Sequence, residues 1–348
     1  MFGTNRPNRY SFKIGELHIE TVTKYKYLGV FFSSSGSFLN AKVHLVEQAK
    51  KAMHLLYKRI FNLDLPIDLQ LQLFDHTIVP ILTYSAEVWG YENTKIIEQV
   101  HLSFLRKITK TRMSTPAYML YGETGRYPLN IIIKSKMIQF WTTLLRGKES
   151  KIFPYFYLAM FNDSSRNFKW TNYVKSVLDN TGFSYIWLQQ SSHVNPKLHK
   201  CIKQVLIDQF IQVWHSEKNN SNKGKNYAIY KETLELEKYF LSLPTSFRLH
   251  LSKFRMANHK FPVETGRYNN TEYAERYCQK CNSDIGDEFH YLLVCPFYNT
   301  LRKKYLSPYY FARPNVIKYK ELLNTDDPSV TTKLAIFVKY LVNNVVAT

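Results

Sequence analysis

Four side chains near the end of the chain have the types and the spacing of a metal site. They follow the pattern Cys-x2-Cys-x8-His-x4-Cys and are Cys278, Cys281, His290 and Cys295. Structural zinc is bound by four Cys and His ligands in a tetrahedron, and a Cys-x-x-Cys turn lets two thiolates reach one ion. We therefore expect one structural Zn²⁺ here, because four protein ligands leave no open position for catalysis.

The cysteine count favours a metal site over disulfides. The chain has 4 Cys, and the three in this segment cannot all pair with one another; a chance cluster is the alternative. The fourth, Cys201, lies in an apolar helical stretch, where we expect a small core residue. His259 is expected to pack rather than to serve as a fifth ligand. A small number of cysteines, three of them in a metal pattern, is typical of proteins in a reducing compartment. We therefore expect a cytoplasmic and nuclear protein.

Carboxylates that could hold catalytic metal ions are not evident in the sequence. Two-metal catalysis needs paired carboxylates that place the ions about 4 Å apart. The pair Asp326-Asp327 lies in a polar stretch that is typical of a turn or helix cap. The acids among the cysteines, Asp284, Asp287 and Glu288, are more simply explained as solvated side chains. The sequence also lacks a glycine-rich phosphate-binding motif, so we expect no nucleotide cofactor.

The charge of the chain favours a polyanionic partner. Lys and Arg number 47 against 27 Asp and Glu, which gives 348 residues a formal net charge of +20. Such an excess is typical of proteins that bind nucleic acid, although a biased codon usage would also enrich Lys. We expect no membrane partner, because no segment reaches the roughly 18 consecutive apolar residues of a membrane span and no strong basic amphipathic helix is present.

The residue patterns predict a mainly α-helical chain with short strands at its start. Residues 10–32 are rich in β-branched and aromatic residues, as strands are. Apolar residues at helical spacing predict helices over about 39–61, 69–82, 97–108, 131–145 and 197–215. Pro80 should kink the second of these helices or break its last turn. The polar stretch 216–226 is expected to be a flexible linker.

Several segments resemble the C-terminal part of reverse transcriptases from non-LTR (LINE-type) retrotransposons. Residues 26–30 (KYLGV) are similar to the strand that follows the palm. Residues 80–90 (PILTYSAEVWG) and 121–129 (YGETGRYPL) are similar to the helical thumb and its continuation. Residues 254–268 (FRMANHKFPVETGRY) and 286–296 (GDEFHYLLVCP) resemble the flanks and core of the family's CCHC segment. The segments occur in the family's order.

The resemblance implies a division of the chain and a loss of catalysis. In this family a Tyr-x-Asp-Asp hairpin precedes the Tyr-Leu-Gly strand and holds the catalytic metals, and this sequence does not contain it. The family's enzyme is an RNA-directed DNA polymerase, but this chain alone is expected to be inactive. The implied parts are palm-end strands (1–34), a helical thumb (35–113), a helical connector (114–245), a CCHC zinc module (246–305) and a C-terminal helical tail (306–348).

The expected role is to grip RNA or an RNA–DNA duplex through basic residues. The expected phosphate contacts in the thumb are Lys51, Lys58, Lys107, Lys110 and Arg112. Those around the zinc module are Arg255, Lys260, Arg267, Arg276, Lys280, Arg302 and Lys303. Tyr268 and Tyr298 are expected to stack on unpaired bases, and Phe289 is expected mainly to pack in the core. A zinc-containing protein-interaction module and a decayed, non-functional element are the alternative interpretations.

Overall fold

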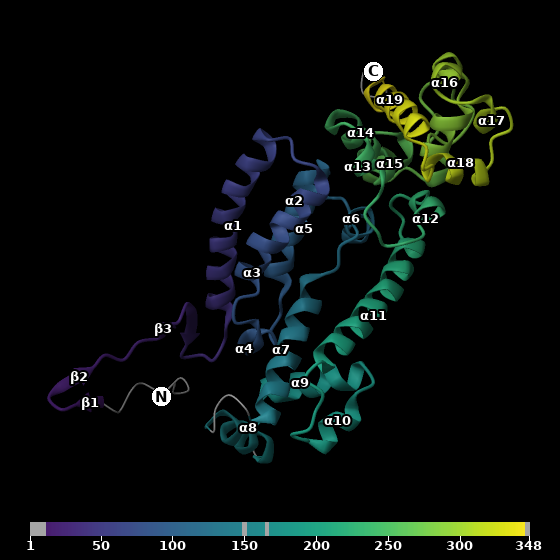
Figure 1. Ribbon diagram of the computed structural model, residues 1–348. Coiled ribbons are helices and arrows are strands. Elements are labelled where there is room, and N and C mark those ends of the chain that lie inside the picture. The colour runs from purple at the N-terminus through teal and green to yellow at the C-terminus, as the bar shows by residue number, and fades with distance from the viewer. Residues whose placement is uncertain (1–11, 148–151, 164–166, 345–348) are drawn as a thin grey trace. The chain divides into compact units, whose positions relative to one another are not determined.

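The computed structural model describes residues 12–147, 152–163 and 167–344. The chain is mainly helical, as expected, with two small antiparallel sheets (Figure 1). It divides into two compact units. The first consists of Met1–Phe61, Gln72–His101 and Pro128–Asp208, and the second of Asn62–Leu71, Leu102–Tyr127 and Gln209–Thr348. None of the helices in the described ranges combines the length and apolar character that crossing a membrane would require.

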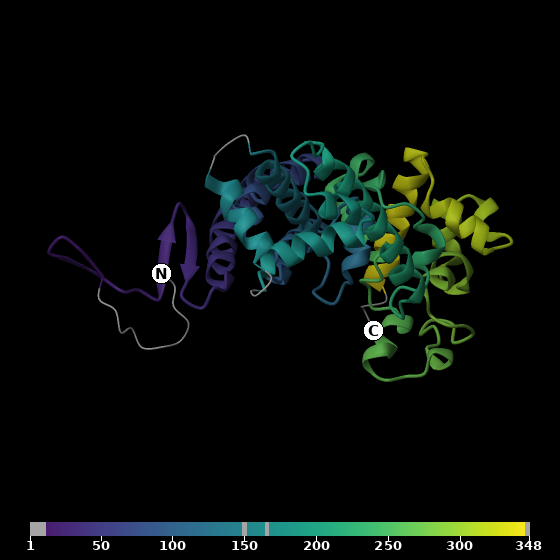
Figure 2. The same cartoon turned by 90° about the horizontal axis from the view of Figure 1, so that it is seen from below.

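Two short hairpins open the described part of the first unit. Their strands are β1 (Phe12–Ile14), β2 (Leu17–Ile19), β3 (Lys24–Tyr27) and β4 (Val30–Ser33). The first hairpin pairs β1 with β2 and is exposed throughout. The second pairs β3 with β4 and lies beside the first long helix, α1 (Leu39–Asn62), as Figure 2 shows.

The segment 26–30 is a hairpin turn rather than one continuous strand. Tyr27 pairs with Val30, which leaves Leu28 and Gly29 as a two-residue loop with φ values of 45° and 85°. Positive φ at both positions is what a tight type I′ hairpin requires, and glycine adopts it without strain. The expectation of strands over 10–32 is thus confirmed for residues 12–32, since residues 10 and 11 lie outside the described part. The Tyr-Leu-Gly sequence marks the point where the chain reverses.

The helices follow the predicted periodicity closely. After α1 come α2 (Ile67–Thr77), α3 (Val79–Leu82), α4 (Ala86–Trp89), α5 (Lys95–Thr109), α6 (Ala117–Thr124), α7 (Leu129–Arg146), α8 (Ile152–Asn162), α9 (Lys169–Asn180), α10 (Ser184–Gln189) and α11 (Leu198–Asn220). The break between α2 and α3 falls at Ile78, two residues before Pro80, which confirms the predicted interruption.

Aromatic residues form much of the core of the first unit. Helix α7 packs against α4, α8 and α9. The rings of Trp141 and Trp187 stack with centroids 5.8 Å apart, and Trp141 Nε1 donates to the hydroxyl of Tyr157 at 2.8 Å.

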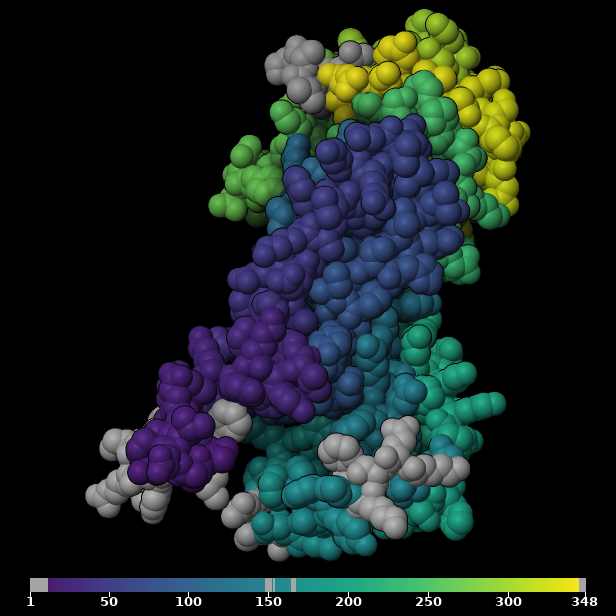
Figure 3. All heavy atoms as spheres, turned by 60° about the vertical axis from the view of Figure 1, so that its left-hand side comes forward, coloured from purple at the N-terminus to yellow at the C-terminus, as the bar shows by residue number. Residues whose placement is uncertain are grey.

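Helix α1 buries one side and exposes the other. Its solvent-facing side carries the exposed side chains of Lys51 and Lys58, and Figure 3 shows this helix at the surface.

Cys201 is exposed, contrary to the expectation of a core residue. The buried residues near it in the first unit are Leu198, Ile202 and Leu206, spaced by four along α11. Successive residues on a helix point about 100° apart. Cys201 therefore lies off the buried stripe, although it directly precedes the buried Ile202.

Short helices dominate the second unit after α11. They are α12 (Tyr227–Tyr230), α13 (Tyr239–Ser242), α14 (Thr245–Arg255), α15 (Pro262–Tyr268), η1 (Tyr273–Glu275), η2 (His290–Val294), η3 (Pro296–Tyr298), α16 (Asn299–Tyr305), α17 (Pro308–Phe311), α18 (Val316–Leu323) and α19 (Pro328–Asn344). Helix α14 packs along α19. Asp327 Oδ1 accepts the backbone N–H of Ser329 at 2.8 Å, which confirms that the Asp-Asp pair belongs to a helix cap.

The segment 216–226, expected as a flexible linker, is packed into the second unit. Its first residues belong to α11, and the side chains of Lys218 and Lys223 are each only 6% exposed. Lys218 Nζ donates to the carbonyl of Lys231 at 2.6 Å, and Lys223 Nζ donates to the carbonyl of Ser114 at 2.9 Å. Two of its three lysines therefore satisfy backbone carbonyls, a role that composition alone does not reveal.

Candidate metal centre and basic surface

A tight loop positions the first two cysteines. Cys278 follows a single β-bridge between Tyr277 and Ile285, and its N–H donates to the carbonyl of Asp284 at 2.7 Å. The N–H of Asn282 returns to the carbonyl of Cys278 at 2.9 Å, with Asn282 in the left-handed region at φ 54°. The chain therefore reverses directly after Cys281, so that both thiols face the inside of the loop.

A π-helical turn positions the other two ligands. His290 begins the turn η2, and the N–H of Cys295 donates to the carbonyl of His290 at 2.8 Å. In an α-helix two residues five apart would point about 140° away from each other, and the wider turn brings them closer. Arg302 secures this turn by donating to the carbonyls of Leu292 at 2.8 Å and Cys295 at 2.9 Å.

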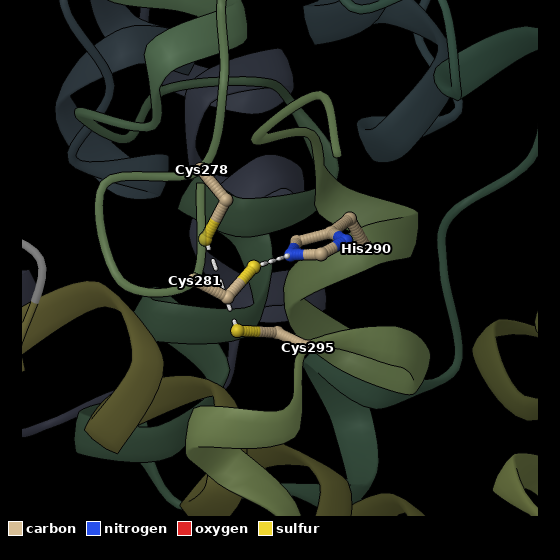
Figure 4. Close-up of side chains that lie close together, drawn as sticks. All are labelled: Cys278, Cys281, His290 and Cys295. Atoms are coloured by element: carbon tan, nitrogen blue, oxygen red, sulfur yellow. Dashed lines mark hydrogen bonds between the residues drawn. The ribbon is translucent and has the colours of Figure 1, made fainter. Parts of the chain in front are cut away.

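The four side chains point toward one another (Figure 4). Their ligand atoms all lie within 4.8 Å of one another. Sγ of Cys278 and Sγ of Cys295 are 3.8 Å apart, and Sγ of Cys281 is 3.2 Å from Nε2 of His290. In a zinc tetrahedron the edges are about 3.8 Å between two sulfurs and about 3.5 Å between sulfur and nitrogen. The three cysteines are free, so the cluster could bind a metal ion.

The electrostatics of the cluster also suit a cation. The hydrogen bond with Cys295 lowers the pKa of the Cys278 thiol, so the pair favours one thiolate. The same hydrogen bond, together with burial, raises the pKa of Cys295, because a second thiolate beside the first would be repelled. A bound cation would remove this repulsion and allow the thiolates to coexist.

A buried hydrogen-bond network supports the histidine ligand. Asp287 Oδ1 accepts the backbone N–H of His290 at 2.8 Å. The adjacent Glu288 is 4% exposed and accepts from Asn226 Nδ2 at 2.8 Å, and His259 Nε2 lies 2.8 Å from its other oxygen. Glu288 is therefore not the solvated acid that we expected from the sequence. His259 pairs with this carboxylate and stacks on Phe261 with ring centroids 4.0 Å apart, in agreement with its expected packing role.

Arg255 was expected to contact phosphate, and that expectation is wrong. The residue is only 1% exposed. Nε lies 3.1 Å from Oε2 of Glu123, Nη2 lies 3.0 Å from Oε2 of Glu237, and Nη1 donates to the carbonyl of Leu323 at 2.8 Å. The residue thus joins α6, α14 and α18 inside the second unit. The YGETGRYPL and FRMANHKF segments meet through the Glu123–Arg255 pair.

Three further candidates make contacts within the protein: Arg302 and Tyr298 are buried, and Arg276 is half-buried with its guanidinium bonded to backbone carbonyls. Arg302 is 2% exposed and holds the π-helical turn. Arg276 donates through Nη1 to the carbonyl of Val263 at 2.9 Å and through Nη2 to that of Thr271 at 2.8 Å. Tyr298, expected to stack on bases, is 1% exposed. Arginine provides several donors in a rigid fork, so it often satisfies clustered carbonyls instead of contacting a ligand.

The remaining candidates reach the surface. Phe289 is half-buried and packs edge-on against Tyr319, in line with the expected core role. Arg267 and Lys280 are half-buried, and Arg267 Nη1 pairs with Glu264 at 2.9 Å. The exposed candidates are Lys51, Lys58, Lys107, Lys110, Arg112, Lys260, Tyr268 and Lys303.

The structure adds one cation that the sequence did not single out. Partial burial, together with the like charges of Lys110 and Arg112, lowers the pKa of Lys253. Burial also lowers the pKa of Lys223, and the like charges of Arg267 and Arg112 contribute to this decrease. Residues from distant segments of the second unit therefore gather their charges. We call Lys110, Arg112, Lys253, Arg267 and Tyr268 the basic surface.

Helix α14 ends with Lys253 and Arg255. This position in the last turn of a basic helix was the only feature of the sequence that could have indicated a role for Lys253 in a basic surface. Their order in the sequence does not reveal which of the two side chains is buried. Comparison with family models, curated proteins and solved structures finds no match for this chain. The resemblance to LINE-type reverse transcriptases therefore rests on the sequence segments alone.

Proposed function

We propose that the second unit binds RNA or an RNA–DNA duplex through the basic surface, and that Zn²⁺ in the Cys278–Cys281–His290–Cys295 cluster holds its fold. Three sulfur ligands and one imidazole in a near-tetrahedral arrangement are the set that structural zinc prefers. This role agrees with the C-terminal part of a LINE-type reverse transcriptase, a part that binds nucleic acid without performing the polymerase reaction.

The crowding of like charges on the basic surface carries this proposal. In the described part of the chain, no carboxylate forms an ion pair with Lys110, Arg112 or Lys253. Like charges that lie close together destabilise a fold unless anions balance them. A row of phosphates would supply the balance, and neutral partners would not.

Exposed aromatic rings on the same unit favour unpaired bases as an additional contact. Tyr268 is 64% exposed and lies close enough to Lys223 to affect the pKa of that lysine. Phe297 is 60% exposed, and Nζ of Lys280 lies 5.4 Å from its ring centroid. Base stacking on such rings adds affinity without sequence specificity, which suits a protein that grips nucleic acid of many sequences.

The test compares RNA binding by the native chain and the variant Lys110→Ala/Arg112→Ala/Lys253→Ala. We expect the variant to bind a labelled single-stranded RNA at least about tenfold more weakly in fluorescence anisotropy at moderate salt, because three phosphate contacts are lost. The matched control removes three exposed lysines of the first unit, Lys175, Lys200 and Lys203, and thus the same charge.

Equal losses in both variants would mean that net charge, and not this surface, determines binding. The absence of RNA binding by a folded, metal-loaded protein would contradict the proposal. That result would favour the alternative, a zinc-containing protein-interaction module in which the same cations are solvated or face an acidic protein.

A further inference from the structure

The first unit contains a cavity of about 1000 Å³ that the proposed function does not use. Residues at the beginnings of three long helices line it, namely Leu39 of α1, Lys95 of α5 and Lys169 of α9. Hydroxyl and amide groups complete the wall, including those of Ser35, Tyr173 and Asn172. The cavity therefore combines positive charge with many polar groups that can donate hydrogen bonds.

The charges in this cavity do not cancel. Glu92 is the only acid among the described lining residues. Its Oε2 pairs with Nζ of the buried Lys42 at 2.7 Å, and its Oε1 accepts the N–H of Phe38 at 2.9 Å. Glu92 is thus already neutralised from within the fold. The two other lysines of the lining, Lys95 and Lys169, have no carboxylate there to balance them.

The positions of these lysines are unfavourable in the absence of an anion. Lys95 and Lys169 are the first residues of their helices, where the helix dipole places partial positive charge and favours acids. The first turn of α9 contains no acid, and Phe168 before it supplies no side-chain cap to the free N–H groups. At α5, by contrast, Asn93 Oδ1 accepts the N–H of Lys95 at 2.8 Å and Glu98 lies in the first turn. An anion in the cavity would therefore supply an acceptor for the N–H groups of α9 and a counter-charge for the two lysines.

We propose that this cavity binds the phosphate of a phosphate monoester, with Lys95 and Lys169 supplying the charge. Hydroxyl and amide donors such as those of Ser35 and Asn172 suit the several oxygens of a phosphate, and Tyr91 and Tyr173 offer ring faces for an organic group. The phosphate could belong to a free mononucleotide or to the 5′ end of a nucleic-acid strand. The cavity and the basic surface lie in different units, so neither proposal depends on the other.

Binding is tested with the full chain and three probes: adenosine 5′-monophosphate, and one oligonucleotide with either a 5′-phosphate or a 5′-hydroxyl. Calorimetry measures the first, and anisotropy at 0.2 M salt measures the other two. We expect Lys95→Gln/Lys169→Gln to weaken binding of a 5′-phosphate probe by roughly tenfold or more. The control Lys175→Gln/Lys200→Gln, with the same loss of charge in the same unit, should bind as the native chain does.

The pattern across the probes identifies the source of the phosphate. A lysine-dependent loss with the mononucleotide supports a small ligand, and a loss confined to the 5′-phosphorylated strand supports a strand end. The proposal is overturned if no phosphate probe binds, or if the lysine variant and the control bind equally. In phosphate-free buffer Lys95→Gln/Lys169→Gln should also melt no lower than the native chain, since it removes unfavourable cations; a lower melting temperature would contradict the argument.

Discussion

Replacing Arg255 by Met should destabilise the second unit strongly, although Met fills a similar volume. The side chain is 0% exposed and compensates Glu123, which is also 0% exposed. Three N–H···O contacts to Glu123 and one to the carbonyl of Leu323 disappear together. Breaking a buried ion pair by removing one partner costs about 3–5 kcal/mol, because the other charge stays buried without compensation. Glu237 keeps Lys231 as a partner, so most of the loss should come from Glu123.

Hydrogen exchange in increasing urea measures this loss where it occurs. Peptides from α14 should lose protection in Arg255→Met, while peptides from α7 in the first unit should not. The exposed Arg313 gives a matched control, and Arg313→Met should change stability by less than about 0.5 kcal/mol. In Glu123→Gln/Arg255→Met the loss should be smaller than the sum of the two single losses, because the unpaired charge is gone. If Arg255→Met is as stable as Arg313→Met and binds RNA more weakly, Arg255 contacts phosphate and the buried ion pair is wrong.

Two further predictions concern the metal and pH. Purified protein should contain about one zinc per chain, and chelation or Cys281→Ser should unfold the second unit, because structural zinc supplies folding free energy. Metal analysis measures the zinc content, and thermal melting measures the stability. The control Cys201→Ser, which lies outside the cluster, should change neither the zinc content nor the melting temperature. Burial opposes ionisation of Glu237, but the charges of Arg255 and Lys231 outweigh this effect and lower the pKa of Glu237 below the ordinary value of a glutamate side chain. A carboxylate with a lowered folded-state pKa contributes stability above its unfolded-state pKa of about 4.3, and this contribution is lost as the pH falls through the folded-state pKa. The difference in stability between the native chain and Glu237→Gln, measured by urea titration, should therefore shrink as the pH falls below about 4.3.

Helices could be predicted from the sequence because their signal is local. The apolar spacing over 39–61 corresponds to α1 (Leu39–Asn62) within one residue, and Pro80 marks the break before α3. The metal cluster could also be predicted from the sequence, because Cys and His residues at this spacing have few roles other than metal binding. Side-chain periodicity and ligand chemistry are both written in short stretches of sequence.

The roles of the basic residues could not be predicted, because they depend on partners far away in the sequence. Arg255 meets Glu123 across 132 positions, and Lys223 donates to a carbonyl 109 positions away. In the sequence, Lys253 and Arg255 look alike. Only the fold shows that Arg255 enters the core and that Lys253 joins Lys110 and Arg112.

The salt dependence of RNA affinity tests the central claim most directly. For single strands the slope of log K against log salt is about −0.7 for each phosphate neutralised. Removing Lys110, Arg112 and Lys253 should therefore make the slope about 2 less steep, while the control variant lacking Lys175, Lys200 and Lys203 keeps the native slope. A native slope in the variant that lacks the basic surface would contradict the account, because these residues would then neutralise no phosphate.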